Sequence, residues 1–293
     1  MKIFQVIAPF RSLILQKTEI KYQDEIKSAF YTAHQRTLHP SVTYLKSEEI
    51  LKRVTTIIIS EDNTHDHHAV HHFSNLVNDE IKHDSFMKRR VIFSDGCSSQ
   101  YKSRGPFADL AQKETPTNRN YFGSEHGKSE CDGEIGILNR ALDRAIIGKQ
   151  AIINKATYLY NYCQINLEIN DPVSKRLFKL VKLGEINRKR NGTNIQNITN
   201  TGKFYQVLNK VKKNEIKVRN LSCFCKQCEA ELYEKCLNSK YIECFTTKKL
   251  ILLNKTGELQ KSENVPKIKN LSQNIAVNQH VQVKSLMKYQ GKN

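Results

Sequence analysis

The sequence lacks tryptophan, has few glycines and prolines, and contains no long apolar run. Its 293 residues hold 12 Gly and 6 Pro, which excludes collagen-like and Gly/Pro-rich low-complexity classes. No stretch reaches about 18 consecutive apolar residues, so we expect no segment that spans a membrane. Hydrophobic residues make up 39 % of the chain, enough to build a core. The length suits one large domain with an appendage, or two modest domains.

Acidic residues are scarce in the second half of the chain. Residues 1–150 hold 21 Lys and Arg against 19 Asp and Glu, whereas residues 151–293 hold 26 against 10. The second half therefore carries most of the net charge of +18. Such a polycation favours a partner with phosphates or another anionic surface. The alternative is a solvated stretch that is simply rich in Lys and Asn.

The chain begins MKIFQVIAPFRSLILQ, which superficially resembles a secretory signal. Pro9 and Arg11 interrupt the apolar run, and no small-residue cleavage site follows, so we expect no signal here. The eight cysteines are then expected to be reduced thiols or metal ligands rather than disulfides.

Short apolar runs alternate with helical patterns, which indicates an α/β or α+β domain. The runs predict strands at 41–46, 54–60, 90–94 and 120–123, and apolar residues at helical spacing predict helices over 68–83 and 134–147. Further on, the polar composition of 184–202 indicates a linker or long loop, residues 203–221 suggest a hairpin, and residues 254–293 are expected to be mostly disordered.

Two aspartates are candidates for chemistry. Asp95 directly follows the strand predicted at 90–94, where sheet enzymes keep catalytic groups, and the polar run 97–104 after it suits a phosphate backbone. Asp132 lies near the start of a predicted helix and could hold a divalent cation together with Asp95. The alternative for Asp95 is an ordinary Asp-Gly turn.

A histidine cluster and a cysteine cluster are candidates for metal binding. Residues 65–72 contain five His and Asp66, which could bind zinc, although a helix start with Asp66 near the N-cap and His toward solvent is favoured. The five cysteines that fall within 22 residues are Cys223, Cys225, Cys228, Cys236 and Cys244. Their spacing fits no standard zinc finger, so we expect four of the five to bind zinc, with the subset open. The alternative is a cluster of buried or surface thiols.

Three motifs occur in an order that is similar to a known family. SEDNTHDHHAVHHF, VIFSDGCSSQYKSRGPFADL and NYFGSEHGKSECDGEIG, with the segment before them from Gln23, resemble transposon-derived proteins of invertebrates. That family looks like DDE transposases with an RNase H-like core, and the resemblance covers about 23–145. It implies an RNase H-like mixed sheet flanked by helices. It also makes 41–46 and 54–60 antiparallel neighbours, and pairs 90–94 with the first strand.

The resemblance implies metal-dependent cleavage and strand transfer on DNA. Asp95 would be the second catalytic acid and Asp132 the third, with Glu130 and Glu134 as weaker candidates, and the acids would hold Mg²⁺ or Mn²⁺. The residues implied to contact backbone phosphates are Lys102, Arg104 and Lys128.

The first catalytic acid of the family has no counterpart here. No aspartate precedes Asp24, and Glu19 does not match the position of the acid. Met1–Ala8 or Ser12–Gln16 could still supply the central strand. We therefore expect a degenerate, inactive enzyme. The alternatives are a non-catalytic basic nucleic-acid-binding protein, and a remnant that does not fold stably.

The sequence predicts five segments. They are a divergent N-terminus (1–22), an RNase H-like core (23–165), a basic extension (166–221), a Cys-rich zinc-binding segment (222–245) and a basic tail (246–293). We expect DNA as partner, and neither a membrane nor a small-molecule substrate. Two short basic clusters, Lys88-Arg89-Arg90 and Arg188-Lys189-Arg190, are compatible with a nuclear location.

Overall fold

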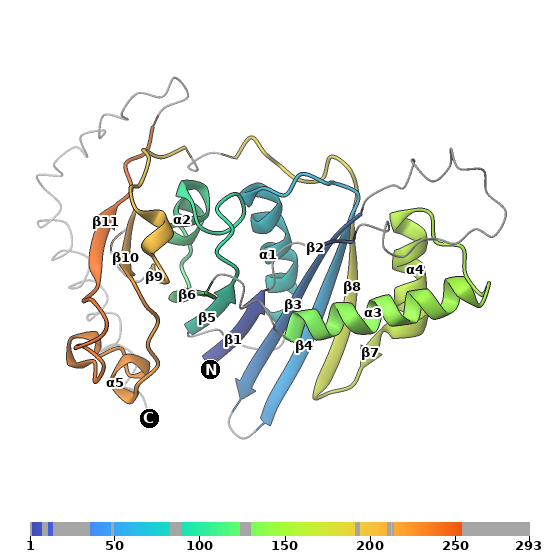
Figure 1. Cartoon of the computed structure of the whole chain (residues 1–293), viewed down its shortest axis with the longest axis horizontal. Coiled ribbons are helices and arrows are strands. Elements are labelled where there is room, and N and C mark those ends of the chain that lie inside the picture. Colours follow the sequence, from blue (N-terminus) through green and yellow to red (C-terminus); the bar gives the residue numbers. More distant parts are fainter. Residues whose placement is uncertain are drawn as a thin grey trace, which may run out of the picture. The chain divides into compact units, whose positions relative to one another are not determined.

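Helices and strands alternate along the chain in a mixed α/β arrangement (Figure 1). The computed structural model describes residues 2–7, 11–13, 36–47, 50–82, 89–123, 130–190, 194–209, 212 and 214–253. The strands are β1 (Lys2–Ile7), β2 (Arg11–Leu13), β3 (Arg36–Ser47), β4 (Ile50–Ser60), β5 (Arg89–Ser94), β6 (Thr117–Tyr121), β7 (Ile169–Asn170), β8 (Ser174–Val181), β9 (Gln206–Leu208), β10 (Glu215–Arg219) and β11 (Thr246–Lys249). The helices are α1 (His67–Lys82), α2 (Arg104–Ala111), α3 (Glu130–Ile147), α4 (Ala156–Leu167) and α5 (Lys226–Glu229), with short 3-10 turns η2 (Thr201–Lys203) and η3 (Tyr233–Lys235).

The described strands join in one mixed sheet with β1 at its centre. The order across the sheet is β11-β10-β9-β6-β5-β1-β3-β4-β8-β7, and β2 pairs with β3. β1 runs antiparallel to β3, with Phe4 beside Tyr44, and parallel to β5, with Val6 beside Phe93. Of the two N-terminal segments that could supply the central strand, Met1–Ala8 therefore does so. The sheet has no gap at its centre.

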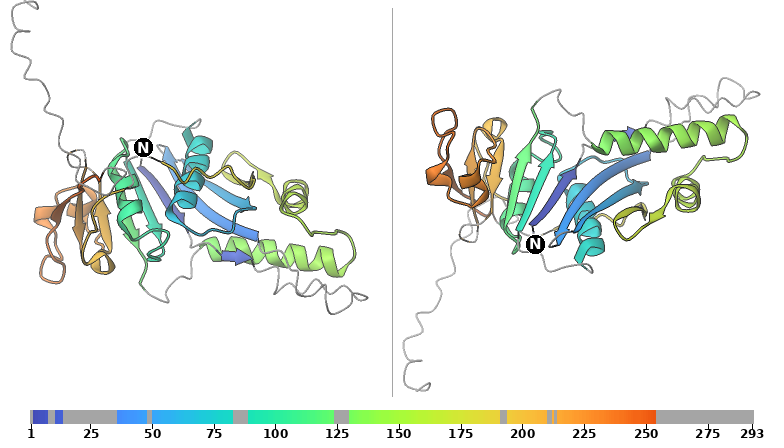
Figure 2. Two further views of the ribbon diagram at one scale, coloured as in Figure 1. Left: turned by 90° about the horizontal axis from the view of Figure 1, so that it is seen from above. Right: turned by 90° about the horizontal axis from the view of Figure 1, so that it is seen from below.

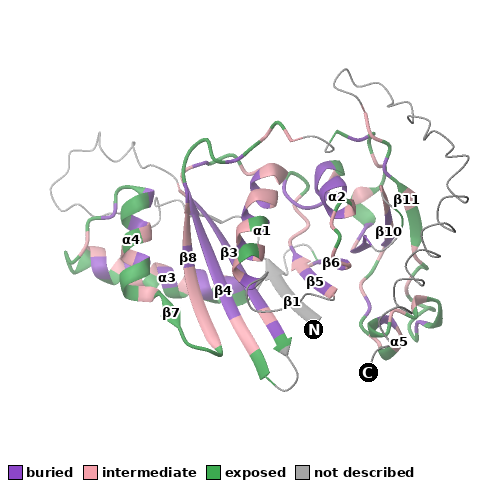
Figure 3. Cartoon of the chain, turned by 180° about the vertical axis from the view of Figure 1, so that it is seen from behind, coloured by how far each residue is buried: buried purple, intermediate pink, exposed green. Residues whose placement is uncertain are grey.

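Helices cover both faces of the sheet (Figure 2). Because side chains alternate along a strand, Ile58 of β4 packs with Phe73 of α1 and Phe107 of α2 on one face. Its neighbours Ile57 and Ile59 pack on the other face against α3 and α4. Figure 3 shows this burial along the central strands. Each such fully buried side chain contributes about 1.5–3 kcal/mol to the free energy of unfolding.

The structure confirms most of the elements expected in the first half of the chain. The strands predicted at 41–46, 54–60 and 90–94 are parts of β3, β4 and β5, and the two helical patterns correspond to α1 and α3. β3 and β4 pair antiparallel, and β9 and β10 form the expected antiparallel pair. The structure adds elements that the sequence did not indicate, among them α2, α4 and β8. The sheet also continues past residue 165, because β8 pairs with β4 and β9 pairs with β6.

The segment expected as a linker, 184–202, is fixed to the core where it is described. Arg188 binds Asp62 and Asp66, each at 2.7 Å, and Ile186 and Ile195 are buried. Arg190 donates to Asp109 Oδ2 at 3.0 Å. We call residues 184–190 and 194–201 the strap. In the two basic clusters, Arg90 is buried, and Arg188 and Arg190 are held by carboxylates.

Two further findings concern the described helices and the cysteines. No described helix has the length and apolar content that crossing a membrane requires. All eight cysteines are free of disulfide bonds.

Candidate metal centre

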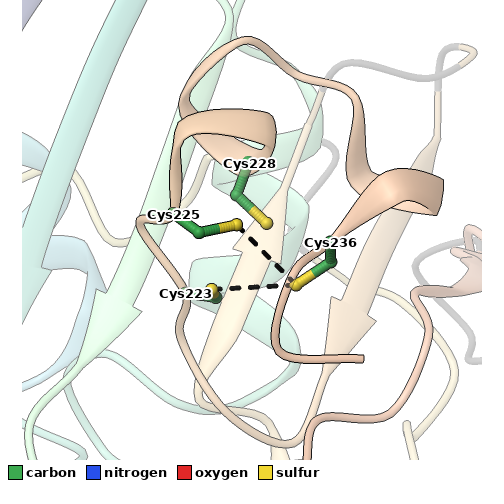
Figure 4. Close-up of side chains that lie close together, drawn as sticks. All are labelled: Cys223, Cys225, Cys228 and Cys236. Atoms are coloured by element: carbon green, nitrogen blue, oxygen red, sulfur yellow. Dashed lines mark hydrogen bonds between the residues drawn. The ribbon is translucent and has the colours of Figure 1, made fainter. Parts of the chain in front are cut away.

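Four cysteines come together in the segment that follows β10 (Figure 4). Cys223 and Cys225 lie in the loop that leaves β10, Cys228 lies in α5, and Cys236 follows η3. Two tight turns bring them close, since the carbonyl of Cys225 accepts from Glu229 N–H and that of Tyr233 accepts from Cys236 N–H. The four Sγ atoms all lie within 4.8 Å of one another.

The sulfur spacing fits a tetrahedral metal ion. Four sulfurs at about 2.3 Å from zinc lie about 3.8 Å from one another. The Sγ atom of Cys236 lies 3.7 Å from that of Cys223 and 4.0 Å from that of Cys225. Disulfide sulfurs would lie about 2.05 Å apart, so these thiols are not bonded to each other. The four cysteines can therefore bind a metal ion such as zinc.

The structure selects four of the five cysteines that the sequence offered. Cys244 is exposed and stands outside the group, because the chain turns at 238–242 and carries it toward β11. The spacing along the sequence could not make this choice, since the turns at α5 and η3 decide which thiols meet.

Hydrogen-bond donors lie close to the sulfurs and favour the thiolate form that binds metal, against burial, which raises the pKa of the Cys228 thiol to about 12. The backbone N–H groups of Cys228 and Leu237 lower the pKa of the Cys225 thiol to about 6. Asn238 Nδ2 donates to Cys223 Sγ at 3.2 Å. Arg219, only 4 % exposed, points two guanidinium nitrogens at Cys228 Sγ, at 3.7 and 3.8 Å.

Arg219 connects the cysteines to the sheet. Its Nε donates to Gln206 of β9, and its guanidinium lies 4.4 Å from the ring centroid of Phe245. Four thiolates around Zn²⁺ leave a net charge of −2, which a buried cation beside them offsets. Sequence reasoning missed Arg219 and Asn238. No signal marks Arg219, because EIKVR carries its cations on one face of an ordinary alternating strand.

Loss of the Arg219 guanidinium is expected to weaken zinc binding. We expect Arg219→Met to lower the zinc affinity about 10- to 100-fold, because it removes the cation that contacts Cys228. Competition with a chromophoric chelator measures this affinity. Lys226→Met removes the same charge from an exposed position of α5 and serves as control. Equal losses in both variants would mean that general charge, and not the contact with Cys228, is responsible.

Among the described residues, the acids expected to form a Mg²⁺ or Mn²⁺ site belong to no group of three or more metal-binding side chains. Asp95 follows β5, its Oδ1 accepts the N–H of Gly96, and its charge acts on Lys102. Asp132 lies half-buried in the first turn of α3. Among the described residues, the four cysteines are the one group of three or more metal-binding side chains. The geometry therefore does not support a Mg²⁺ or Mn²⁺ site.

The two weaker candidates for the third acid are held by other residues. Glu130 accepts a hydrogen bond from the hydroxyl of Tyr44 at 2.5 Å. Glu134 is buried and binds Arg53 at 2.7 Å and Arg176 at 2.8 Å. Glu134 thus joins α3 to β4 and β8, a structural role that sequence spacing could not reveal.

The histidine cluster lies at the start of α1, which is the interpretation that the sequence favoured. Asp66 caps α1, because its Oδ1 accepts the N–H of Ala69 at 2.9 Å. The expectation that the histidines face solvent is wrong, because all five of them are half-buried. The rings of His67 and His68 lie against each other at a tilt, with their centroids 3.9 Å apart. The packing of α1 against α2 causes the burial of His67, since Gly105 of α2 lies against its ring.

The three cations expected to contact phosphates differ in their surroundings. Lys102 is 5 % exposed, with its ammonium 3.8 Å from the ring centroid of Tyr205 and 5.1 Å from that of Tyr121. Burial lowers the pKa of Lys102 to about 8. Arg104 is exposed, and Lys128 lies outside the described residues.

The fold and this site define a mixed α/β protein with a four-cysteine segment that can hold a metal ion. Within that class, the chain belongs to a family described as a domain of unknown function (DUF8701), whose model matches residues 18–222. The match begins after β1 and ends at Ser222, so the central strand and the four cysteines lie outside it. No curated protein and no solved structure matches the chain.

Proposed function

We propose that this chain is a nucleic-acid-binding protein built on an RNase H-like core of the DDE transposase type, in which the catalytic site is incomplete. The observation that carries the proposal is the central sheet. Its strands β4-β3-β1-β5-β6 lie side by side, with β3 antiparallel to its neighbours and β1, β5 and β6 parallel. This order agrees with what the resemblance implied. In that arrangement 41–46 and 54–60 are antiparallel neighbours, and 90–94 pairs with the first strand.

The register of β1 supports the loss of catalysis. Val6 of β1 lies beside Phe93, so the carboxyl end of β1 reaches the same edge of the sheet as Asp95. The sequence of β1 is KIFQVI, with neither Asp nor Glu. A two-metal site that lacks a bridging carboxylate loses several kcal/mol of transition-state stabilisation. That β1 lies outside the family match agrees with a replaced first strand.

The distribution of lysines in the second half supports electrostatic binding. Its buried or ion-paired arginines include Arg176, Arg188, Arg190 and Arg219, which serve the fold. Exposed lysines remain to contact phosphates, including Lys182, Lys189, Lys203, Lys212, Lys226, Lys235, Lys240 and Lys249. Scattered lysines bind as point charges, which favours binding that tolerates any base sequence.

DNA binding without cleavage is the expected result for the purified full chain. We expect binding to a short DNA duplex whose log affinity falls linearly with log salt, since each contacted phosphate releases counterions. We expect no nicking of supercoiled plasmid in Mg²⁺ or Mn²⁺. Asp95→Ala is the control, because it should alter neither result.

Two outcomes would overturn parts of the proposal. Metal-dependent nicking that disappears in Asp95→Ala would show a working acid site. Binding that is absent at low salt, or that does not change with salt, would remove the electrostatic basis of the nucleic-acid interaction.

A further inference from the structure

A polar pocket of about 550 Å³ lies where the N-terminal ends of α1 and α2 meet the strap. His67 and His68 of α1, Arg104 and Gly105 of α2, and Asn197 of the strap belong to its lining. α1 follows β4 and α2 follows β5, so the pocket lies at the carboxyl ends of strands that run in one direction. Open α/β sheets commonly bind ligands at this edge.

The charges around the pocket favour an anion. None of the described residues that line it is acidic, and Arg104 is the lining residue with a permanent charge. The nearest carboxylates, Asp66 and Asp109, are bound by Arg188 and Arg190. The amino end of α2 adds positive partial charge, whereas the amino end of α1 is already capped by Asp66.

The two histidines offer neutral ring nitrogens at this pocket. Burial lowers the pKa of His68 to about 4, and burial also lowers the pKa of His67. Both rings are therefore uncharged near neutral pH. Nδ1 of His68 accepts a hydrogen bond from Nε of Arg190 at 3.2 Å, which leaves Nε2 of His68 as the N–H donor. The two rings add hydrogen-bond donors to the pocket without adding a positive charge.

Donors are available in the first turn of α2. Ser103 is the N-cap residue but makes no side-chain cap, so it leaves the backbone N–H groups of Arg104 and Gly105 uncapped, while Pro106 has no N–H. The hydrogen bonds of Arg104 use one terminal nitrogen, which lies 3.3 Å from Asn197 Oδ1 and 3.5 Å from the carbonyl of Ile195. Its Nε and second terminal nitrogen can form the paired bonds that a phosphate accepts.

The approach of the two helices depends on Gly105. A Cβ atom at this position would lie 2.5 Å from Cδ2 and Nε2 of His67, far inside contact distance. The glycine therefore allows the first turn of α2 to lie against the first turn of α1. Any side chain here would move the ring that forms one wall of the pocket.

We propose that this pocket binds a phosphate group, carried either by a single nucleotide or by a polynucleotide backbone. The polynucleotide source rests on the proposed function, whereas the phosphate chemistry of the pocket does not. Arg104 supplies the charge, and the uncapped N–H groups of α2 with the neutral imidazoles of α1 supply further hydrogen bonds.

The first experiment titrates inorganic phosphate into the full chain by calorimetry, at an ionic strength held constant with chloride. We expect Arg104→Met to weaken phosphate binding about tenfold or more, because a charge-assisted contact is lost. Arg140→Met is the matched control, since Arg140 is exposed on α3 and loses the same charge. Equal affinity in wild type and Arg104→Met, or no binding by the wild type, would overturn the proposal.

A second variant tests the shape of the pocket without changing its charge. Gly105→Ala should weaken phosphate binding while Arg104 remains, because the added methyl group displaces His67. Phosphate binding unchanged in Gly105→Ala would contradict the arrangement described here. Arg104→Met alters an exposed side chain, so its result remains informative even where Gly105→Ala lowers stability.

The two sources of phosphate are separated by repeating the titrations with a nucleoside 5′-monophosphate and with single-stranded DNA. A loss of DNA affinity in Arg104→Met would identify the backbone as ligand, and a loss confined to the mononucleotide would identify the small ligand. DNA binding that does not depend on Arg104, with no phosphate binding, overturns the pocket and leaves the proposed function standing. Arg104-dependent phosphate binding without any DNA binding would support the pocket and overturn the proposed function.

Discussion

Replacement of Cys228 by serine is expected to abolish zinc binding and to unfold the four-cysteine segment. Structural zinc sites in small domains contribute about 10–16 kcal/mol of apparent binding free energy, which is folding free energy when the site forms only with the metal. In this chain Cys223, Cys228 and Cys236 pack mainly on one another, with Tyr233 and Ile242 beside them. So small an apolar cluster cannot hold these turns without the metal.

Metal content and local stability are the measurements for this prediction. Cys228→Ser should contain no zinc after purification, whereas Cys244→Ser, at the exposed cysteine outside the group, should retain one ion per chain. Hydrogen exchange should accelerate across the cysteine segment in Cys228→Ser but stay slow in β3 and β4, which lie across the sheet from it. Equal zinc contents in the two variants would refute the assignment of the four ligands.

The elements that could be predicted are those with a strong local pattern. VTTIIIS in β4 and RVIFS in β5 are β-branched or apolar runs that end at acidic or glycine residues, so their strands were predictable. The residues of β1 were one of two candidates for the central strand. The sequence could not decide between them, because the position of KIFQVI in the sheet depends on its pairing with β3 and β5. Register and neighbours are long-range properties that composition does not carry.

The elements that were missed have charges or turn residues that conceal their pattern. β8 reads SKRLFKLV, and its cations place it in the segment predicted as a basic extension, 166–221. In the structure Arg176 binds buried Glu134, and Lys179 binds Glu80 of α1. α2 begins at the end of the polar run 97–104 and contains Pro106, which the first turn of a helix tolerates. For the site, spacing along the chain identified the cysteines but neither the choice among them nor Arg219.

Replacement of Glu134 by alanine is expected to lower the free energy of unfolding by about 3–5 kcal/mol. The Glu134 side chain is 4 % exposed and accepts from both Arg53 and Arg176. Without the carboxylate, two cations would face each other between α3, β4 and β8, with no anion between them to offset their charge. Glu80→Ala is the matched control, since the Glu80–Lys179 pair also joins a helix to β8. The Glu80 side chain is 29 % exposed against 4 % for Glu134, and its loss should cost about 0–1 kcal/mol.

The pH dependence of stability separates the charge of Glu134 from its packing. Burial alone would raise the pKa of Glu134, but hydrogen bonds from Arg176 and Arg53 outweigh it, so the pKa lies below 4.5. A carboxyl group with a lowered pKa contributes stability that is present above 4.5 and is lost as the pH falls through the folded-state value. The difference between wild type and Glu134→Ala, measured by chemical unfolding, should therefore be constant near neutrality and shrink below pH 4.5. A difference that stays the same at low pH would mean that the lost methylene contacts, and not the ion pairs, hold α3 against the sheet.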